Sequence, residues 1–270
     1  EENAQWRIDA EQNIEKYRKG NFSLFFYKDG KPLPNAQVEI KQTKHHFRFG
    51  TAVSSDEINS DEMYFLTVKK LFNSVVFEND LKAKRWKNKE KIPATIAAID
   101  KLNANNIKVK GHVLLWPGFN YLPGVYEKNK SNPKKIEKLI CDHYKSILAE
   151  TKGKISHWDV LNEAYTNKDI PDIFGSNEIL FDAFKKAKEL DPNSKRYINE
   201  YGIISGGGIN TKKQDWYYNF IQEIDKKTNG AIDGLAMQSH IGTDVTPPAK
   251  VIEILNRFAT LNKEISISEF

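Results

Sequence analysis

The sequence of 270 residues contains a single cysteine, Cys141, which excludes an internal disulfide bond. No apolar run approaches the length of a membrane-spanning helix, so we expect no part of this sequence to enter a membrane. The first five residues carry no basic and apolar leader, so we expect that any signal peptide has been removed or never existed. With 39% hydrophobic and 29% charged residues, the composition is that of an ordinary soluble globular protein.

Sites for metals, phosphates and nucleic acids are also lacking. No cysteine and histidine residues occur at metal-ligand spacing, and the Gly206–Gly208 run lacks the spacing and the Lys-Ser/Thr of a phosphate-binding loop. We therefore expect a flexible turn at this glycine run. The net charge of +5 is modest, and lysines such as Lys185 and Lys186 follow an amphipathic helical pattern. The pattern predicts solvated surfaces rather than a nucleic-acid interface.

The first part of the sequence predicts a helix followed by a β-hairpin. The helix covers about residues 6–17, and the strands cover 22–27 and 36–41, joined by a turn that contains Asp29 and Gly30. The segment is too short to build a core of its own. We therefore expect residues 1–44 to be an N-terminal decoration of one catalytic domain that covers residues 1–270.

From about residue 45, short apolar or alternating segments occur in regular alternation with amphipathic helical patterns. This order predicts right-handed βαβ units and a parallel sheet, and without a dinucleotide fingerprint it favours a (β/α)8 TIM barrel. The expected strands lie near residues 47–53, 74–77, 108–116, 155–162, 196–199, 234–240 and 265–269. The clearest helical patterns between them cover residues 92–102, 136–148, 180–190, 215–224 and 249–261.

The strand count falls short of a closed barrel. A barrel of this type has eight strands, whereas the sequence reaches Phe270 at the end of the seventh. We therefore expect residues 45–270 to be a barrel truncated before its eighth strand, in a piece of a longer enzyme.

Polar and aromatic residues collect where the expected strands end, which is the functional face of such barrels. Two of them, Glu163 and Glu269, are carboxylates that follow different strands. Two carboxylates facing each other suit the cleavage of a glycosidic bond, because one protonates the leaving oxygen while the other attacks the anomeric carbon or activates water. The other polar and aromatic residues at strand ends are Glu78, Asn79, Lys82, His112, Trp116, Asn162, Asn199, Glu200, Tyr201, Gln238 and His240.

These strand ends carry motifs that resemble glycoside hydrolase family 10, the xylanase family. Six segments match the family's pattern in the expected order between about His46 and the final residue. They are Glu78-Asn79-x-x-Lys82, Gly111-His112-x-x-x-Trp116, Trp158-Asp159-Val160-Leu161-Asn162-Glu163, Asn199-Glu200-Tyr201, Gln238-Ser239-His240 and Ile265-Ser266-Ile267-Ser268-Glu269.

The resemblance implies a role for each matching residue. Glu163 is expected to be the general acid and then the base, and Glu269 the nucleophile, about 5–5.5 Å apart as retention of configuration requires. Asn162 is expected to bind the sugar 2-hydroxyl, and His240 to hydrogen-bond the nucleophile. Tyr201 is expected at the leaving-group side. The residues expected to line the glycone subsites are Glu78, Asn79, Lys82, His112, Trp116 and Gln238.

The resemblance also implies an endo-acting enzyme that works on xylan or xylooligosaccharide as a secreted monomer. No cofactor or metal is implied, because two carboxylates and water suffice for the reaction. Two positions depart from the family: Pro117 stands where a histidine usually follows the third-strand tryptophan, and Ala83 where a tryptophan usually follows the second-strand lysine. They keep open a different β-glycan as substrate.

Two further alternatives remain open in the sequence. One is an inactive carbohydrate-binding fragment of such an enzyme, because the eighth strand is absent. The other concerns Glu200, which could be taken for a third catalytic carboxylate, although a supporting hydrogen-bonding role is the better interpretation. His143 and His157 match no motif and predict packing or hydrogen bonding rather than chemistry.

Overall fold

The computed structural model describes residues 4–270 and separates the chain into two compact units. The first unit ends at Phe47 and the second begins at Arg48, a few residues beyond the boundary expected at residue 44. The candidate site lies entirely in the second unit.

The first unit contains the expected helix and hairpin, but the hairpin differs from the prediction. Helix α1 spans Gln5–Arg18, and strands β1 (Tyr27–Lys28) and β2 (Lys31–Pro32) pair antiparallel. Asp29 and Gly30 both adopt positive φ, as a tight two-residue turn requires. The strand predicted over residues 36–41 was wrong: the last backbone bond between the two strands runs from Leu33 N–H to the Phe26 carbonyl oxygen, and a turn at Pro34 and Asn35, the latter with positive φ, follows it.

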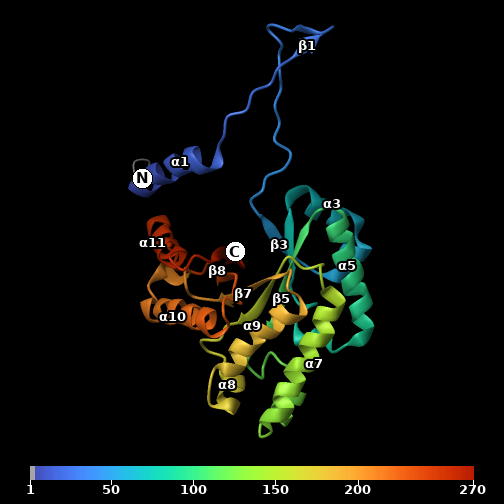
Figure 1. Ribbon diagram of the computed structural model, residues 1–270, viewed down its shortest axis with the longest axis vertical. Helices are drawn as coiled ribbons and strands as arrows, with labels where there is room; N and C mark the ends of the chain where they lie inside the picture. The colour runs from blue at the N-terminus through green and yellow to red at the C-terminus, as the bar shows by residue number, and fades with distance from the viewer. Residues whose placement is uncertain (1–3) are drawn as a thin grey trace. The chain divides into compact units, whose positions relative to one another are not determined.

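The second unit is built on a curled parallel sheet of seven strands, which confirms the fold class predicted from the sequence. The strands follow one another across the sheet in chain order, so each βα unit lies beside the next (Figure 1). They are β3 (Gly50–Val53), β4 (Ser74–Phe77), β5 (Lys108–Leu115), β6 (His157–Asn162), β7 (Lys195–Glu200), β8 (Gly234–Gln238) and β9 (Glu264–Ser268).

Helices connect successive strands and lie around the outside of the curled sheet (Figure 1). The five helices expected from the sequence are present, with ends that differ from the prediction by a few residues. They are α5 (Ile92–Ala104), α7 (Pro133–Thr151), α9 (Glu178–Leu190), α10 (Thr211–Lys227) and α11 (Pro248–Ala259). Shorter helices are α4 (Ala83–Trp86), η1 (Lys89–Lys91), α6 (Val125–Lys128), α8 (Asp169–Phe174) and η2 (Gly206–Gly208).

Helix α7 shows how the sequence pattern becomes packing. Ile136, Ile140, Tyr144 and Ile147 recur at helical spacing and are all buried against the sheet. The Tyr144 hydroxyl reaches the carbonyl oxygen of Val160 on β6 at 3.4 Å. Burial of this stripe anchors the strand that ends at the candidate site.

Two helices between the first and second strands of the sheet were not singled out from the sequence. Helix α2 (Ser55–Ser60) begins after Ser54, whose side chain accepts a hydrogen bond from a backbone N–H of the first turn. Helix α3 (Glu62–Leu71) begins after Asp61, which caps it in the same way at 2.9 Å. Both helices start with a capping residue, which is the local signal that could have located them.

Close packing between β5 and β6 sets the position of the polar residues that follow. Gly111 pairs with Trp158, and a Cβ atom at Gly111 would lie 2.2 Å from the Trp158 indole. Only glycine fits there, because the fully buried indole occupies the space of a side chain. The pairing of His112 with Asp159 follows directly from this register.

The glycine run at 206–208, labelled η2, forms a tight turn in which all three glycines adopt positive φ and Gly208 N–H donates to the Ser205 carbonyl oxygen at 3.3 Å. The flexibility expected there stays a prediction. Within residues 4–270 no helix is long and apolar enough to cross a membrane.

Candidate active site

The two glutamates selected from the sequence lie at the carboxyl ends of two strands. Glu163 directly follows β6 and Glu269 directly follows β9. Both adopt positive φ, 53° and 57°, a conformation that non-glycine residues rarely take. The Glu163 N–H donates to the carbonyl oxygen of Asn199 at 3.0 Å, which fixes the point at which the chain leaves the strand.

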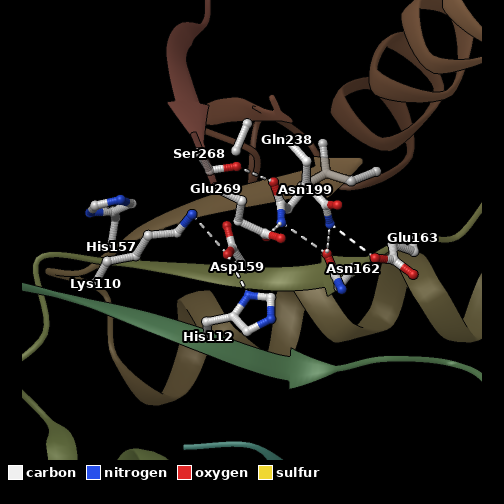
Figure 2. A network of polar contacts seen from close by, with 12 residues as sticks. Lys110, His112, His157, Asp159, Asn162, Glu163, Asn199, Gln238, Ser268 and Glu269 are labelled. Atoms are coloured by element: carbon white, nitrogen blue, oxygen red, sulfur yellow. Dashed lines mark hydrogen bonds and ion pairs between the residues drawn. The ribbon is translucent and has the colours of Figure 1, made fainter. Parts of the chain in front are cut away.

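The carboxylate of Glu163 is held by an amide side chain from β8. Gln238 Nε2 donates to Glu163 Oε1 at 3.0 Å, and the same amide nitrogen lies 3.4 Å from Asn162 Oδ1 (Figure 2). Gln238 and Asn162 are buried, whereas Glu163 is partly exposed. The carboxylate therefore has one fixed hydrogen bond and remains open to a ligand.

The carboxylate of Glu269 has a fixed partner on each oxygen. Asn199 Nδ2 lies 2.8 Å from Oε1, and His240 Nε2 lies 2.9 Å from Oε2. The His240 side chain is 66% exposed and that of Glu269 is 30% exposed, so this pair lies at the mouth of the site.

Asn199 joins the two halves of the site. Besides Glu269, its Nδ2 donates to Asn162 Oδ1 at 3.0 Å, while its Oδ1 accepts from Ser268 Oγ at 2.7 Å. An unbroken chain of side-chain contacts thus runs from Glu163 through Gln238, Asn162 and Asn199 to Glu269 (Figure 2).

Asn199 was missing from the residues selected as substrate-binding or catalytic, although its motif was recognised. The signal that could have found it is register: Asn199 of β7 lies directly opposite Asn162 of β6. Side chains of paired residues in neighbouring strands point to the same face of the sheet. The two asparagines therefore had to meet on the inner face.

Below these residues lies a buried charged cluster centred on Asp159 of β6. Lys110 Nζ and His112 Nδ1 each lie 2.9 Å from Asp159 Oδ2, and the aspartate side chain is completely buried (Figure 2). Burial acts to raise the pKa of Asp159, but Lys110 and His112 outweigh it and the pKa lies below its ordinary value. His112, expected to bind substrate, is thus anchored through one ring nitrogen.

The aromatic residue expected to stack on sugar is Trp116, immediately after β5. Its ring is stacked on that of Tyr121, with centroids 3.7 Å apart and planes 6° apart. Lys82 Nζ lies 5.6 Å from the indole centroid and 3.2 Å from Asn79 Oδ1. Three of the residues expected to line the glycone subsites, Asn79, Lys82 and Trp116, therefore form one group. Glu78, also expected there, is exposed and directly follows β4.

On the other side of Glu163, Glu200 and Tyr201 occupy the end of β7. Glu200 is fully buried and forms an ion pair of 2.8 Å with Lys213 of α10. Burial raises the pKa of Glu200, and Lys213 opposes that effect without cancelling it. Tyr201, expected at the leaving-group side, is 36% exposed. The supporting role that the sequence analysis favoured for Glu200 stays a prediction.

The two departures from the family pattern are each the next residue in the chain after a member of the Trp116–Lys82 group. Ala83 begins α4 and is buried, and Pro117 is buried directly after Trp116. The carbonyl oxygen of Pro117 accepts a hydrogen bond of 3.0 Å from Ile170 N–H. Among residues 4–270, no three His, Cys, Asp or Glu side chains form a group that could hold a metal ion.

A pair of glutamates in one polar network at the carboxyl end of a parallel (β/α) sheet is the arrangement of barrel-type glycoside hydrolases. The comparison with known families agrees. The sequence profile of glycosyl hydrolase family 10 matches residues 39–270, and this chain belongs to that family.

The chain resembles proteins named as xylanases and a protein named as an anti-sigma factor. The β-1,4-xylanase of Dictyoglomus thermophilum is 31% identical over 92% of this chain and 70% of its own length. The anti-sigma-I factor RsgI6 of Acetivibrio thermocellus is 29% identical over 98% of this chain. The chain spans only 34% of the length of that second protein.

Solved structures agree on the fold. The crystal structure of native xylanase 10B from Thermotoga maritima superimposes with a TM-score of 0.70 and 26% identity, covering 83% of this chain and 69% of that chain. These comparisons confirm the family and the barrel fold predicted from the motifs. The roles of individual residues stay predictions.

Proposed function

We propose that this chain is the catalytic domain of an endo-acting β-1,4-xylanase that retains anomeric configuration. The observation that carries the proposal is the continuous side-chain network joining Glu163 to Glu269 at the ends of β6 and β9. Membership of family 10 and a xylanase among the relatives support the reaction and the substrate.

The reaction would proceed in two displacements. In the first, Glu269 attacks the anomeric carbon while Glu163 donates its proton to the departing glycosidic oxygen, leaving a glycosyl ester on Glu269. In the second, Glu163 removes a proton from a water molecule that attacks the same carbon and releases Glu269. Inverting the carbon twice restores the β configuration.

The contacts of the two carboxylates suit these roles. Glu269 has a polar neighbour within 2.9 Å of each oxygen, Asn199 and His240, which hold the carboxylate in one orientation. Glu163 has a single amide partner, Gln238, and can exchange its proton without breaking an ion pair. Asn162, which contacts both Gln238 and Asn199, would bind the sugar hydroxyl next to the anomeric carbon.

The remaining site residues are proposed to bind the sugar chain. Trp116 and Tyr201 provide aromatic surface, and the polar side chains match the hydroxyl rim of a xylose ring. The residues proposed for the glycone side are Glu78, Asn79, Lys82, His112, Trp116 and Gln238. We further propose that the protein works as a secreted monomer, with residues 1–44 as an N-terminal decoration of the single catalytic domain.

The test is hydrolysis of soluble xylan followed by proton NMR, which distinguishes β from α products as they form. We expect β-anomers first. Azide then separates the two roles: with an activated aryl β-xylobioside, Glu163→Ala should yield β-xylobiosyl azide, because the glycosyl ester still forms. Initial α products, or the same azide adduct from Glu163→Ala and Glu269→Ala, would contradict the assignment.

A second candidate function is the binding of carbohydrate without turnover. The observation in its favour is the anti-sigma-I factor, a protein named for a regulatory role that carries a region similar to 98% of this chain. Calorimetric titration with xylotetraose, alongside a product assay over days, separates the candidates. Saturable binding with no product supports the binding function, and product formation excludes it.

Ala83 and Pro117, the buried departures from the family pattern, keep a different β-glycan open as the substrate. Turnover of aryl xylobioside and of aryl cellobioside is compared to decide between them. We expect faster turnover of the xylobioside. The reverse preference would retain the mechanism and change the substrate to a β-glucan.

A further inference from the structure

The buried ion pair between Glu200 and Lys213 contacts the loop that follows Glu163 and the loop that follows β7. Glu200 is the last residue of β7, and Lys213 lies in the first turn of α10. Their side chains are 0% and 2% exposed, and Lys213 Nζ lies 2.8 Å from Glu200 Oε1. An ion pair so completely removed from water carries a large desolvation cost and stabilises only when further hydrogen bonds satisfy the charges.

The further hydrogen bonds of Glu200 go to the backbone of two different loops. Its Oε2 accepts from Tyr165 N–H at 3.1 Å, two residues beyond Glu163 in the loop after β6. Its Oε1 accepts from Tyr201 N–H at 3.1 Å, in the loop after β7. One carboxylate thus ties together the loop that follows Glu163 and the loop that begins with Tyr201.

The ammonium group of Lys213 contacts the side chains of the same two loops. Its Nζ lies 3.0 Å from the ring centroid of Tyr201 and 5.1 Å from that of Tyr165, which places the cation against two aromatic rings. The Tyr201 hydroxyl also reaches Thr166 Oγ1 at 3.5 Å. The contact between the loops therefore involves both backbone and side chains.

The loop after β6 has other fixed points close to Glu163: Ala164 is fully buried, and the ring of Tyr165 packs edge-on against that of Trp216 of α10, with centroids 5.0 Å apart. Glu163 N–H donates to the Asn199 carbonyl oxygen at 3.0 Å, and Asn167 donates to the Glu163 carbonyl oxygen through its backbone and side-chain nitrogens. The first of these hydrogen bonds fixes the strand end and the second closes the loop upon itself. The bond from Tyr165 to Glu200 links the loop beyond Glu163 to the neighbouring strand.

We infer that the Glu200–Lys213 pair is a positioning device that holds Glu163 at the height of the glycosidic oxygen by clamping its loop against the loop of Tyr201. The catalytic part of this inference rests on the proposed function, because it assigns Glu163 the role of acid. Neither Glu200 nor Lys213 touches substrate; each acts through the loops. A displacement of the acid by about 1 Å is enough to lower a rate 100-fold.

The test is Lys213→Met, which keeps the length of the side chain and removes its charge, with Lys212→Met as matched control. Lys212 is the exposed neighbour on the same helix. Hydrogen exchange followed by mass spectrometry should show faster exchange in peptides covering 163–168 and 201–206, with the peptides of α5 and α7 unchanged. Exchange unchanged in those two loops would overturn the inference, whether or not the chain is active.

A second readout separates positioning from general damage. We expect kcat/KM for phenyl β-xylobioside, whose strongly basic phenolate leaves poorly without a proton, to fall roughly 10- to 100-fold in Lys213→Met. For 2,4-dinitrophenyl β-xylobioside, which leaves without help, the fall should be less than about threefold. Equal losses on both substrates would mean a merely structural pair and overturn the inference.

Failure of the proposed function gives a different result, since the unmodified protein would then turn over neither aryl glycoside while its loop exchange still reports on the clamp. If Lys213→Met does not fold, Glu200→Gln provides the same two measurements, because it keeps the side-chain shape and leaves the Lys213 charge in place. Glu200→Gln with normal exchange and normal leaving-group dependence would also overturn the inference.

Discussion

The two ends of the curled sheet are both polar, but they hold their charges differently. At the amino end, His157 of β6 contacts Arg48 at 3.2 Å, and Glu264 of β9 pairs with Lys195 and the Tyr197 hydroxyl. At the carboxyl end, the two glutamates are held by amides and one imidazole.

The difference shows how a barrel separates stability from chemistry. Burial acts to raise the pKa of Glu264, but Lys195 and the Tyr197 hydroxyl outweigh it, so the pKa lies below its ordinary value and the carboxylate keeps its charge. A carboxylate held by a neutral amide can still take up a proton or form a covalent bond. We therefore expect substitutions at the amino end of the sheet to change the stability of the fold, and substitutions at the carboxyl end to change the rate of turnover.

The largest expected effect comes from strand β9, which carries a glutamate at each end. Glu269→Gln keeps the shape of the side chain and removes the nucleophile, so we expect kcat on xylan to fall about 10⁴- to 10⁶-fold. Steady-state kinetics with a sensitive reducing-sugar assay provides the measurement. A loss of kcat of less than tenfold would show that Glu269 is not the nucleophile. The carboxyl end of the sheet would then not differ from the amino end in its effect on turnover.

The next effect concerns the residue that joins the two glutamates. Asn199→Ala removes a hydrogen bond to a carboxylate, an interaction worth about 1.5–3 kcal/mol, so kcat/KM should fall roughly 10- to 100-fold. Asn103→Ala is the matched control, because Asn103 donates a bond of 2.9 Å to the carbonyl oxygen of Lys154 and lies outside the site. Equal activity in the two variants would show that turnover does not depend on the contacts of Asn199 with Asn162 and Glu269.

The amino end should respond to pH through His157. Burial first, and then Lys110 and Arg48, lower the pKa of His157 to about 3, against the opposing effect of Asp159 and Glu264. The unfolded chain binds a proton below about pH 6.5 while the folded chain does not. Stability is therefore full above that pH and falls by up to about 1.4 kcal/mol per unit as pH drops towards 3.

Urea unfolding between pH 7 and 4.5 tests the His157 prediction, with His157→Gln as the comparison. The substituted chain should show a shallower loss of stability with falling pH, since it lacks the titrating ring. Parallel pH profiles of stability in the two proteins would contradict the prediction.

The smallest effect is expected for Glu264→Gln, the counterpart of the Glu269 substitution at the other end of β9. The side chains of Glu264 and Lys195 are nearly half exposed, so their ion pair is worth at most about 1 kcal/mol. We expect a slightly lower melting temperature and kcat within about twofold of the unmodified protein. A large loss of turnover would show that the two ends are coupled.

Much of the fold could be read from local patterns. The seven strands and the five main helices appear where alternating and helical spacings predicted them, because those periods reflect which face of each element is buried. The strand predicted over residues 36–41 does not form: the residues alternate there, but a turn at Pro34 and Asn35 ends the hairpin before them. Alternation of apolar and polar residues shows which side chains can share one face of a strand, but it does not show whether another strand lies alongside to pair with it.

The sequence by itself determined the barrel class, the family and the two candidate glutamates, since these depend on periodicity and on motifs of a few adjacent residues. Only the tertiary structure decided that Asn199 bridges Asn162 and Glu269, and that Glu200 pairs with Lys213. Asn199 and Glu269 are separated by 70 residues in the chain. The physical reason is that a hydrogen bond depends on where folding places two side chains, which sheet register and helix packing set and no local spacing encodes.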